Sequence, residues 1–561
     1  TDDSDAHGSE RITDYALLVQ LNPQQRAAAT YTEGPVLIVA GPGTGKTRTL
    51  TVRIAHLIRD KGVAPESVLA VTFTNKAAEE MQARLADMLE PEVADKITVR
   101  TFHALGALIL QEFATEAGLP ANFTILDEEG QHRLLRRACP ELSGREARAA
   151  LAAISAVKNE LAQAEAPDPD ILRRYATALN AAQAVDFDDL LARTAALLEQ
   201  NEPVRQTLHQ RFRWISVDEY QDLNPVQHRL LRLLAAGGAN VCAIGDPDQA
   251  IYGFRGADHR FFLSFEQDFP GARRFQLTQN YRSAQAILDA ASQVIARNPE
   301  RQALELFSDF VEQVKLTVYR APTDKAEAEY VVHQIEQMVG GTSYFSLDSG
   351  RVEDDTQPVD WSFNDFAVLY RLNAQARLLE EAFDRSGIPY QTVGGLPLTR
   401  QSPAREVLAH LWLLRNPGSP VHWEQVLADG VGHFEAEQMD ALVAHLQKDG
   451  RDTAMALEGA AQELPGLNRR QRERLVALAG FYRNLGRPAR TVDDLVAETA
   501  TFLQEFQGKA FSAGEEERLA RLRRRAAPFR HRLDDFLAAM ALQSETDLYD
   551  PRADRVTLMS L

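Results

Sequence analysis

A glycine-rich loop directly follows an apolar run near the start of the chain and carries the residue types best suited to chemistry. Residues 36–40 read Val-Leu-Ile-Val-Ala, and residues 41–47 read Gly-Pro-Gly-Thr-Gly-Lys-Thr. Glycines permit backbone angles that point successive N–H groups at an anion, and a helix start adds its positive dipole end. We expect Lys46 to reach nucleotide phosphates and the Thr47 hydroxyl to ligate Mg2+, although Ala40 replaces the first glycine of strict GxxxxGKT spacing. The residues expected to cradle the phosphates are Gly41, Gly43, Thr44, Gly45, Lys46 and Thr47.

Two carboxylates end a second apolar run, 214–217. We expect Asp218 to hold Mg2+ through water and Glu219 to accept a proton from the attacking water. Paired acids at a strand end are most often solvated turn residues, and only the upstream loop favours catalysis here. Gln249 follows the next apolar run, 241–244, and its amide suits sensing a γ-phosphate because it both donates and accepts hydrogen bonds.

An aromatic residue and a cation stand side by side farther along the chain, in Asn280-Tyr281-Arg282-Ser283. Tyr281 would stack on a base, and Arg282 would neutralise charge on the transferring phosphoryl group. A surface pair at a helix start is the alternative for these two residues taken alone.

The spacing of apolar runs predicts the elements that position these residues. Short runs at 36–40, 67–73, 214–217 and 241–244 each precede a turn and a helical pattern, which indicates a parallel α/β sheet with chemistry at its strand ends. Residues 106–184 lack strand signals and predict a helical insertion. A second strand set begins near 283, including 314–319 and 366–370. The acidic stretch 340–358 reads as a mobile surface loop, and residues 388–545 again read as helical.

Composition limits the function classes. The 561 residues are 45% hydrophobic, enough for several packed domains. The net charge of −19 means that nucleic-acid binding requires a local basic groove. Two cysteines, Cys139 and Cys242, fit neither a disulfide framework nor a zinc site, and we expect Cys242 in the core. No apolar run is long enough to span a membrane and residues 1–10 are acidic, so we expect a cytoplasmic protein.

Ten segments of the chain follow one another in the order of a known family's motifs. They are 21–25, 41–47, 72–78, 101–103, 218–222, 249–257 and 280–283, continued by 367–375, 394–395 and 556–561. On these segments the chain resembles the UvrD/Rep/PcrA helicases of superfamily 1 over almost its whole length. The resemblance implies two RecA-like parallel-sheet P-loop motor domains, each with a mostly helical insertion. The first domain would be 1–105 with 185–282, with its insertion at 106–184, and the second would be 283–387 with 546–561, with its insertion at 388–545.

The resemblance implies an ATP- and Mg2+-dependent motor that moves 3′ to 5′ on single-stranded DNA and separates duplexes, in repair or replication. Its partners would be single strands, single/double-strand junctions and repair or replication proteins. Gln25 would read the adenine edge, with Tyr281 stacked on the ring. The residues around the triphosphate and metal would be Lys46, Thr47, Arg48, Asp218, Glu219, Gln249 and Arg282. The residues on DNA would be Phe73, Asn75, His103, Tyr252, Phe254 and Arg255, joined by Arg371 and Asn373 from the second motor domain.

Several positions depart from the family pattern. Phe254 stands where the family has tryptophan, which keeps a stacking face with less area, and Pro247 and Ala250 replace acidic and serine residues. The segment 430–432 corresponds to a glycine motif that touches duplex backbone. The arginines Arg521, Arg523, Arg524 and Arg525 either meet duplex phosphates or form a solvated helix face paired with 515–517.

The chain stops before the His-x-x-Lys-Gly-Leu-Glu segment and the arginine-bearing sixth motif. We therefore expect the natural protein to continue, and this chain to bind nucleotide and DNA but hydrolyse slowly. Two alternatives remain at this stage: a motor subunit of a RecB/AddA-like recombination nuclease, and an ATP-switched DNA-binding module that does not unwind. The intact pair of Asp218 and Glu219 argues against the second.

Overall fold

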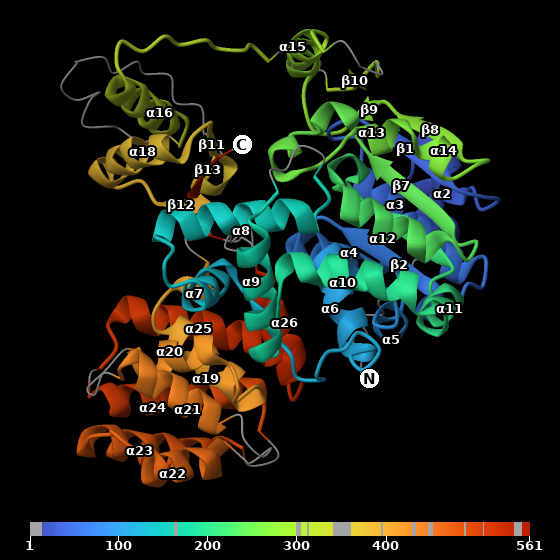
Figure 1. Ribbon diagram of the computed structural model, residues 1–561. Coiled ribbons are helices and arrows are strands. Elements are labelled where there is room, and N and C mark those ends of the chain that lie inside the picture. Colours follow the sequence, from blue (N-terminus) through green and yellow to red (C-terminus); the bar gives the residue numbers. More distant parts are fainter. Residues whose placement is uncertain are drawn as a thin grey trace, which may run out of the picture. The chain divides into compact units, whose positions relative to one another are not determined.

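The computed structural model divides into two units, residues 1–314 with 402–542 and residues 315–401 with 543–561 (Figure 1). It describes residues 14–161, 166–298, 304–310, 314–339, 361–393, 397–428, 434–446, 453–486, 490–508, 510–543 and 553–560. The expected loop at 340–358 and the glycine segments 394–395 and 430–432 lie wholly or mostly outside these ranges. The predicted four-part domain division remains a prediction.

A six-stranded parallel sheet forms the centre of the first unit, in the order β3-β2-β6-β7-β1-β8. All five residues of β1 and of β2 are buried, as expected for strands covered on both faces. The strand predictions at 36–40, 67–73, 214–217 and 241–244 are thereby confirmed. The strands are β1 (Val36–Ala40), β2 (Val68–Thr72), β3 (Thr98–Thr101), β6 (Trp214–Val217), β7 (Asn240–Gly245) and β8 (Arg273–Leu277).

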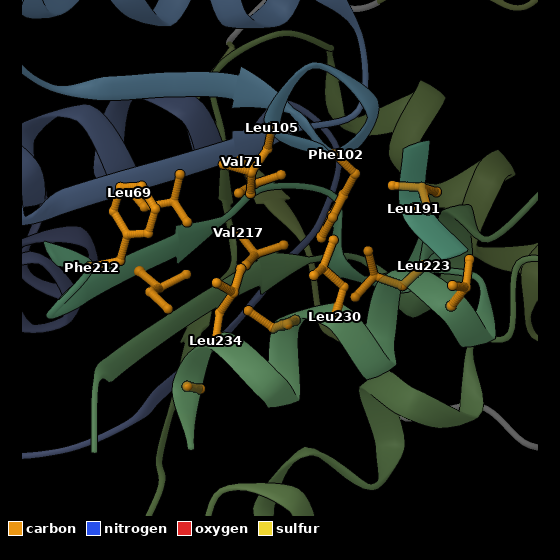
Figure 2. Close-up of a cluster of buried hydrophobic side chains, with 14 of the residues drawn as sticks. Leu69, Val71, Phe102, Leu105, Leu191, Phe212, Val217, Leu223, Leu230 and Leu234 are labelled. Carbon is orange, nitrogen blue, oxygen red and sulfur yellow. The ribbon is translucent and has the colours of Figure 1, made fainter. Parts of the chain in front are cut away.

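Helices cover both faces of this sheet with separate apolar clusters. Figure 2 shows Leu230 and Leu234 of α12 beside Val217 of the sheet, in one of these clusters. Cys242 is buried in the other cluster, as predicted. The helices on one face are α1 (Asp14–Val19), α2 (Pro23–Thr30), α3 (Lys46–Arg59), α4 (Asn75–Met88) and α5 (Pro91–Ala94). Those on the other are α6 (Phe102–Glu112), α10 (Phe187–Gln200), α11 (Glu202–Arg211), α12 (Pro225–Ala235), α13 (Arg260–Leu263) and α14 (Phe265–Asp268).

The segment expected as a purely helical insertion also contains a strand. Helices α7 (Glu128–Ala138), α8 (Gly144–Lys158) and α9 (Pro169–Ala181) share an apolar cluster. Strand β4 (Thr124–Leu126) pairs in parallel with β5 (Ala184–Asp186). Three residues are too few to show a strand pattern, which is why β4 could not be predicted from its residues.

The remaining helices of the first unit lie mainly between residues 402 and 542, within the range 388–545 that the sequence predicted as helical. The start of that predicted range is wrong, because residues 390–393 form a strand of the second unit. They are α15 (Gln285–Ile295), α19 (Ala404–Arg415), α20 (Pro420–Ala428), α21 (Ala436–Leu446), α22 (Thr453–Glu463), α23 (Arg469–Leu485), α24 (Val492–Gln507), α25 (Ala513–Ala526) and α26 (Leu533–Ala541). In α25, Arg523 forms an ion pair with Asp493, with Nε 2.8 Å from Oδ1.

The second unit has a three-stranded parallel sheet in the order β11-β13-β12, packed against two helices. The predicted strand at 366–370 is present, but the one at 314–319 is not: these residues are described without strand structure, and Val318 is 94% exposed. Its alternating apolar residues therefore have no sheet face to pack on. The elements are β11 (Ala367–Tyr370), β12 (Tyr390–Val393), β13 (Val556–Ser560), α16 (Asp324–Val339) and α18 (Asn373–Ser386).

Candidate nucleotide and DNA site

The predicted residues of the first unit follow the carboxyl ends of the sheet's parallel strands. Because these ends meet at one edge of the sheet, the loops that carry the residues gather there. The phosphate loop follows β1, Asp218 follows β6, and Gln249 follows β7. Phe73 follows β2, and His103 lies on α6 directly after β3.

The phosphate loop has glycine-specific backbone at two positions. Gly43 and Gly45 have φ of 66° and 79°, and Gly45 is the N-cap of α3, so Lys46 and Thr47 open the helix. Gly41 does not adopt a positive φ, which corrects the expectation that all three glycines serve by backbone angle. A Cβ on Gly41 would instead meet the end of the Leu306 side chain, which would have to shift to make room.

Gln25 supports the loop from behind. Its side chain is 3% exposed, its Nε2 donates to the Thr44 carbonyl at 2.9 Å, and its Oε1 accepts from the Asn22 N–H at 3.1 Å. The Thr44 hydroxyl donates to the Gly41 carbonyl at 2.7 Å. Gln25 therefore already holds the phosphate loop in place.

The acid-bearing turn, residues 218–222, lies against the loop lysine. Lys46 Nζ is 3.1 Å from Glu219 Oε2, and Gln221 Nε2 donates to the same oxygen at 2.9 Å. Glu219 itself has φ 49° and ψ 46°, the left-handed region that a non-glycine residue rarely adopts. Such a conformation costs about 1–3 kcal/mol and is typical of functional sites.

Burial and crowding of like charges alter the acids of this turn. Asp218 is 6% exposed, and burial, together with the neighbouring Glu219 carboxylate, raises its pKa to about 7. Burial and Glu219 likewise raise the pKa of Asp222 to about 7, and Asp222 Oδ1 has no hydrogen-bond partner among the described residues. The turn thus concentrates negative charge that a bound cation would stabilise.

Gln249 joins the same network through Asp246. Gln249 Nε2 donates to Asp246 Oδ2 at 2.7 Å, and the Asp246 N–H donates to Gln221 Oε1 at 3.0 Å. Burial raises the pKa of Asp246. A chain of contacts therefore runs from Lys46 to Gln249, and Gln221 at its centre is a residue that the sequence analysis did not assign.

Tyr281 and Arg282 are fixed against the phosphate loop by their neighbour Asn280. Asn280 Nδ2 donates to the Pro42 carbonyl at 2.6 Å, and the Tyr281 N–H donates to the Gly43 carbonyl at 2.8 Å. The Tyr281 ring is 48% exposed, with its hydroxyl accepting from Asn22 Nδ2 at 2.8 Å. The Arg282 Cβ lies 2.7 Å from the place of a Cβ on Gly43, and Arg282 is exposed.

Aromatic side chains gather beside this edge, at the turn that we call the aromatic turn, residues 252–256. The Phe73 and Tyr252 ring centres are 5.0 Å apart, and those of Tyr252 and Phe254 are 6.2 Å apart. The Arg255 guanidinium lies 5.6 and 5.5 Å from the centres of the Tyr252 and Phe254 rings. Phe254 is 79% exposed, so this cluster presents ring faces and one cation to solvent.

The other predicted residues are more dispersed. Asn75 Nδ2 donates to the Leu542 carbonyl at 2.7 Å. His103 packs edge-on to Phe187 at 6.1 Å, and burial lowers its pKa to about 4, so it is neutral at pH 7. Arg48 donates to Gln20 Oε1 at 2.9 Å. Arg371 and Asn373 are exposed residues of the second unit, just after β11.

Arg53 is a supporting residue that sequence analysis missed. It is 1% exposed, and its guanidinium donates to the carbonyls of Ala28 and Tyr31 and to Asn240 Oδ1. It thereby closes the C-terminal end of α2, the helix that carries Gln25. Backbone carbonyls have no sequence signature, so no pattern could have identified this contact.

The site suits a nucleotide with Mg2+ better than a metal held by protein alone. Among the described residues, no group of three or more His, Cys, Asp or Glu side chains could hold a metal ion. Mg2+ commonly binds through one or two carboxylates plus substrate phosphates. Asp218, the Thr47 hydroxyl and a glycine cradle for phosphates match this donor set.

These features define a parallel sheet with a P-loop at its edge and an exposed cluster of aromatic side chains beside the loop. Residues 21–270 match the UvrD/REP helicase N-terminal domain, and residues 275–463 match the UvrD-like helicase C-terminal domain. The chain therefore belongs to the UvrD-like helicase family, which confirms the predicted family and fold class.

Several similar proteins share one name, ATP-dependent DNA helicase PcrA. The Leuconostoc citreum protein is 34% identical over 96% of this chain and 74% of its own length. The Staphylococcus aureus and Staphylococcus epidermidis proteins are each 38% identical over 76% of this chain and 58% of their own length. The chain thus spans between 58% and 74% of the length of these relatives. Within the described residues, no helix is long and apolar enough to cross a bilayer.

Proposed function

We propose that this chain is an ATP-dependent DNA helicase that moves 3′ to 5′ on single-stranded DNA and unwinds duplexes, with a role in DNA repair or replication in the cytoplasm. Its partners are single strands and single/double-strand junctions. The observation that carries the proposal is the meeting of phosphate loop, acid-bearing turn and aromatic turn at one edge of one sheet, in a chain of the UvrD-like family.

Nucleotide binding uses the residues of the phosphate loop and the segment 280–282. Backbone N–H groups of the loop bind phosphate oxygens, Tyr281 stacks on the base and Arg282 balances phosphoryl charge. Asp218 and Thr47 hold Mg2+, which supplies charge neutralisation for the phosphates when bound. Gln25 positions the loop and must shift to read an adenine edge, because both ends of its amide have protein partners.

Hydrolysis uses Glu219 as the base. Lys46 forms an ion pair with Glu219, so Lys46 must exchange this partner for phosphate oxygens before Glu219 accepts a proton from water. Gln221 then keeps the carboxylate in place, and Gln249 senses the γ-phosphate from the same network. The side chains that stack on bases are Phe73, Tyr252 and Phe254. The DNA backbone is contacted by Arg255, Arg371, Asn75 and Asn373. The neutral side chain of His103 lies beside the path of the strand.

Strand separation on partial duplexes with a 3′ or a 5′ single-stranded tail tests the proposal. With ATP and Mg2+, the chain should open the 3′-tailed substrate faster than the 5′-tailed one. Glu219→Gln should bind nucleotide but lose about 100-fold or more of the ATPase rate. Glu33→Gln, an exposed change away from the site, is the control. Equal unwinding by Glu219→Gln and the parent chain would contradict the assignment.

A further inference from the structure

The C-terminal end of helix α8 contacts both helix α12, which follows the acid-bearing turn, and the aromatic turn. We call residues 158–161 the α8 end segment. It belongs to the insertion between β4 and β5, and none of its residues is among the nucleotide or DNA ligands proposed above. Its contacts reach the aromatic turn and the start of α12, which begins directly after the acid-bearing turn.

The segment is anchored first to the start of α10. Lys158 Nζ lies 2.6 Å from Asp186 Oδ2 and 2.8 Å from Asp189 Oδ1. Asn159 Nδ2 donates to Asp188 Oδ1 at 2.6 Å. Since Asp186 and Asp189 are buried, the pairing with Lys158 fixes this end of α8 firmly to the main sheet domain.

The segment then contacts the helix that continues from the acid-bearing turn. Asn159 Oδ1 accepts from Asn224 Nδ2 at 2.9 Å, and Asn224 is the N-cap of α12, two residues after Asp222. Glu160 Oε1 lies 2.7 Å from Arg229 Nη1 on the same helix. A displacement of the acid-bearing turn that moves the start of α12 would therefore also move Asn159.

The other end of the segment fits against the aromatic turn. Glu160 has a positive φ of 60°, and the Leu161 N–H donates back to the Ala156 carbonyl at 3.0 Å, so the chain reverses at the helix end. This places the Leu161 side chain where a Cβ on Gly256 would lie. Gly256, with φ 87°, closes the turn that presents Phe254 and Arg255.

We infer that the α8 end segment is a positioning element that couples the phosphate site to the DNA-stacking residues. Asn159 is bonded to the helix that begins after the acid-bearing turn, and Leu161 packs against Gly256 of the aromatic turn. A nucleotide-dependent movement of the acid-bearing turn therefore changes the position of the aromatic turn. A hydrogen bond from the Asp258 N–H to the Leu223 carbonyl, 2.9 Å, joins the residue directly after the acid-bearing turn to the chain just beyond the aromatic turn. The inference rests on the proposed function and adds residues that touch neither ligand.

The test compares the affinity for fluorescent oligo-dT with and without a non-hydrolysable ATP analogue and Mg2+. The ratio of the two dissociation constants measures the coupling. Asn159→Ala and Leu161→Ala should each bring this ratio at least threefold closer to one, the value for no coupling. The affinity for the analogue in the absence of DNA should stay unchanged. Val157→Ala, which trims an exposed aliphatic side chain at the same helix end, should keep the parent ratio.

Glu160→Gly separates coupling from folding. Glycine favours the positive φ at this position, so the variant should be at least as stable as the parent chain while losing the contact to Arg229. A reduced ratio in this variant, with an undiminished melting temperature, supports the inference. Parent-like ratios in Asn159→Ala, Leu161→Ala and Glu160→Gly would overturn it. A parent chain that binds neither analogue nor DNA would overturn the proposed function, and the inference with it.

Discussion

Gln25 shows how one side chain can connect two parts of a nucleotide site. Its amide joins the N-terminal end of α2 to the phosphate loop, and a Cβ on Gly45 would lie 2.7 Å from its Nε2. The same α2 start holds the Tyr281 hydroxyl through Asn22. The start of α2 therefore links the phosphate loop to the two residues proposed to contact the base, Gln25 and Tyr281.

Gln25→Ala should lower stability as well as nucleotide binding. It leaves the Thr44 carbonyl and the Asn22 N–H without their partner, which costs about 1–3 kcal/mol for a buried group. We expect a lower midpoint of urea unfolding in the absence of nucleotide, together with weaker binding of ATP. If Gln25 served only to read adenine, the nucleotide-free midpoint would be unchanged and only the preference for ATP over GTP would fall.

Phe254 should carry a measurable share of single-strand binding. Its ring is 79% exposed and borders Tyr252 and Arg255. Because stacking on an aromatic is worth about 1–3 kcal/mol per base, Phe254→Ala should weaken oligo-dT binding by roughly 5- to 150-fold without changing ATP affinity. Phe254→Leu keeps apolar area without a ring and should be nearly as weak, whereas Phe254→Trp should bind more tightly. Parent-like binding by Phe254→Leu would argue against stacking.

At the scale of elements, the sequence predicted those strands and helices whose own residues show a characteristic pattern. Strand β1 is a continuous apolar run before a glycine loop, and the α/β interpretation followed from it. The run 314–319 has similar residues but forms no strand, because a strand also needs a neighbour, and pairing is not encoded locally. Strand β4 pairs with β5, which lies about 60 residues later in the chain, and Arg53 caps a helix that lies about 25 residues earlier. Neither contact could be predicted from local sequence, because the partners are far apart in the chain.

Within helices α19 to α26, two buried histidines make stability depend on pH. Burial lowers the pKa of His410 and of His422 to about 3, with Tyr482 and Ser419 hydroxyls as their partners at 2.9 and 2.8 Å. The unfolded chain binds protons near pH 6.5 that the folded chain does not, so stability is lost as pH falls below about 6.5. By pH 5 each buried histidine should cost about 2 kcal/mol.

Urea unfolding at pH 7 and pH 5, followed by tryptophan fluorescence, measures this loss, since Trp412 and Trp423 lie in this region. His410→Gln should reduce the difference between the two pH values. His531→Gln, at an exposed position, should leave the difference unchanged. An undiminished pH dependence in His410→Gln would show that other groups are responsible.

At the scale of the whole molecule, the net charge of −19 repels DNA, so the proposed DNA site must bind against this repulsion. Only two of the eight proposed DNA residues, Arg255 and Arg371, carry a permanent positive charge. In a plot of the logarithm of the single-strand binding constant against the logarithm of the salt concentration, each phosphate neutralised contributes about −0.7 to the slope. A site with two cations therefore predicts a slope of about −1.4. Stacking, which salt screens little, must then supply much of the affinity.

Fluorescence anisotropy with oligo-dT over a series of KCl concentrations measures this slope. Arg255→Gln and Arg371→Gln should each make it shallower by about 0.7. Arg524→Gln, an exposed change in the basic run of α25, should leave single-strand binding and its salt dependence unaltered. A slope steeper than about −4 would mean that cations beyond Arg255 and Arg371 contact the strand. A slope that Arg524→Gln reduces would mean that the α25 arginines bind the strand and that the aromatic turn is not its main contact.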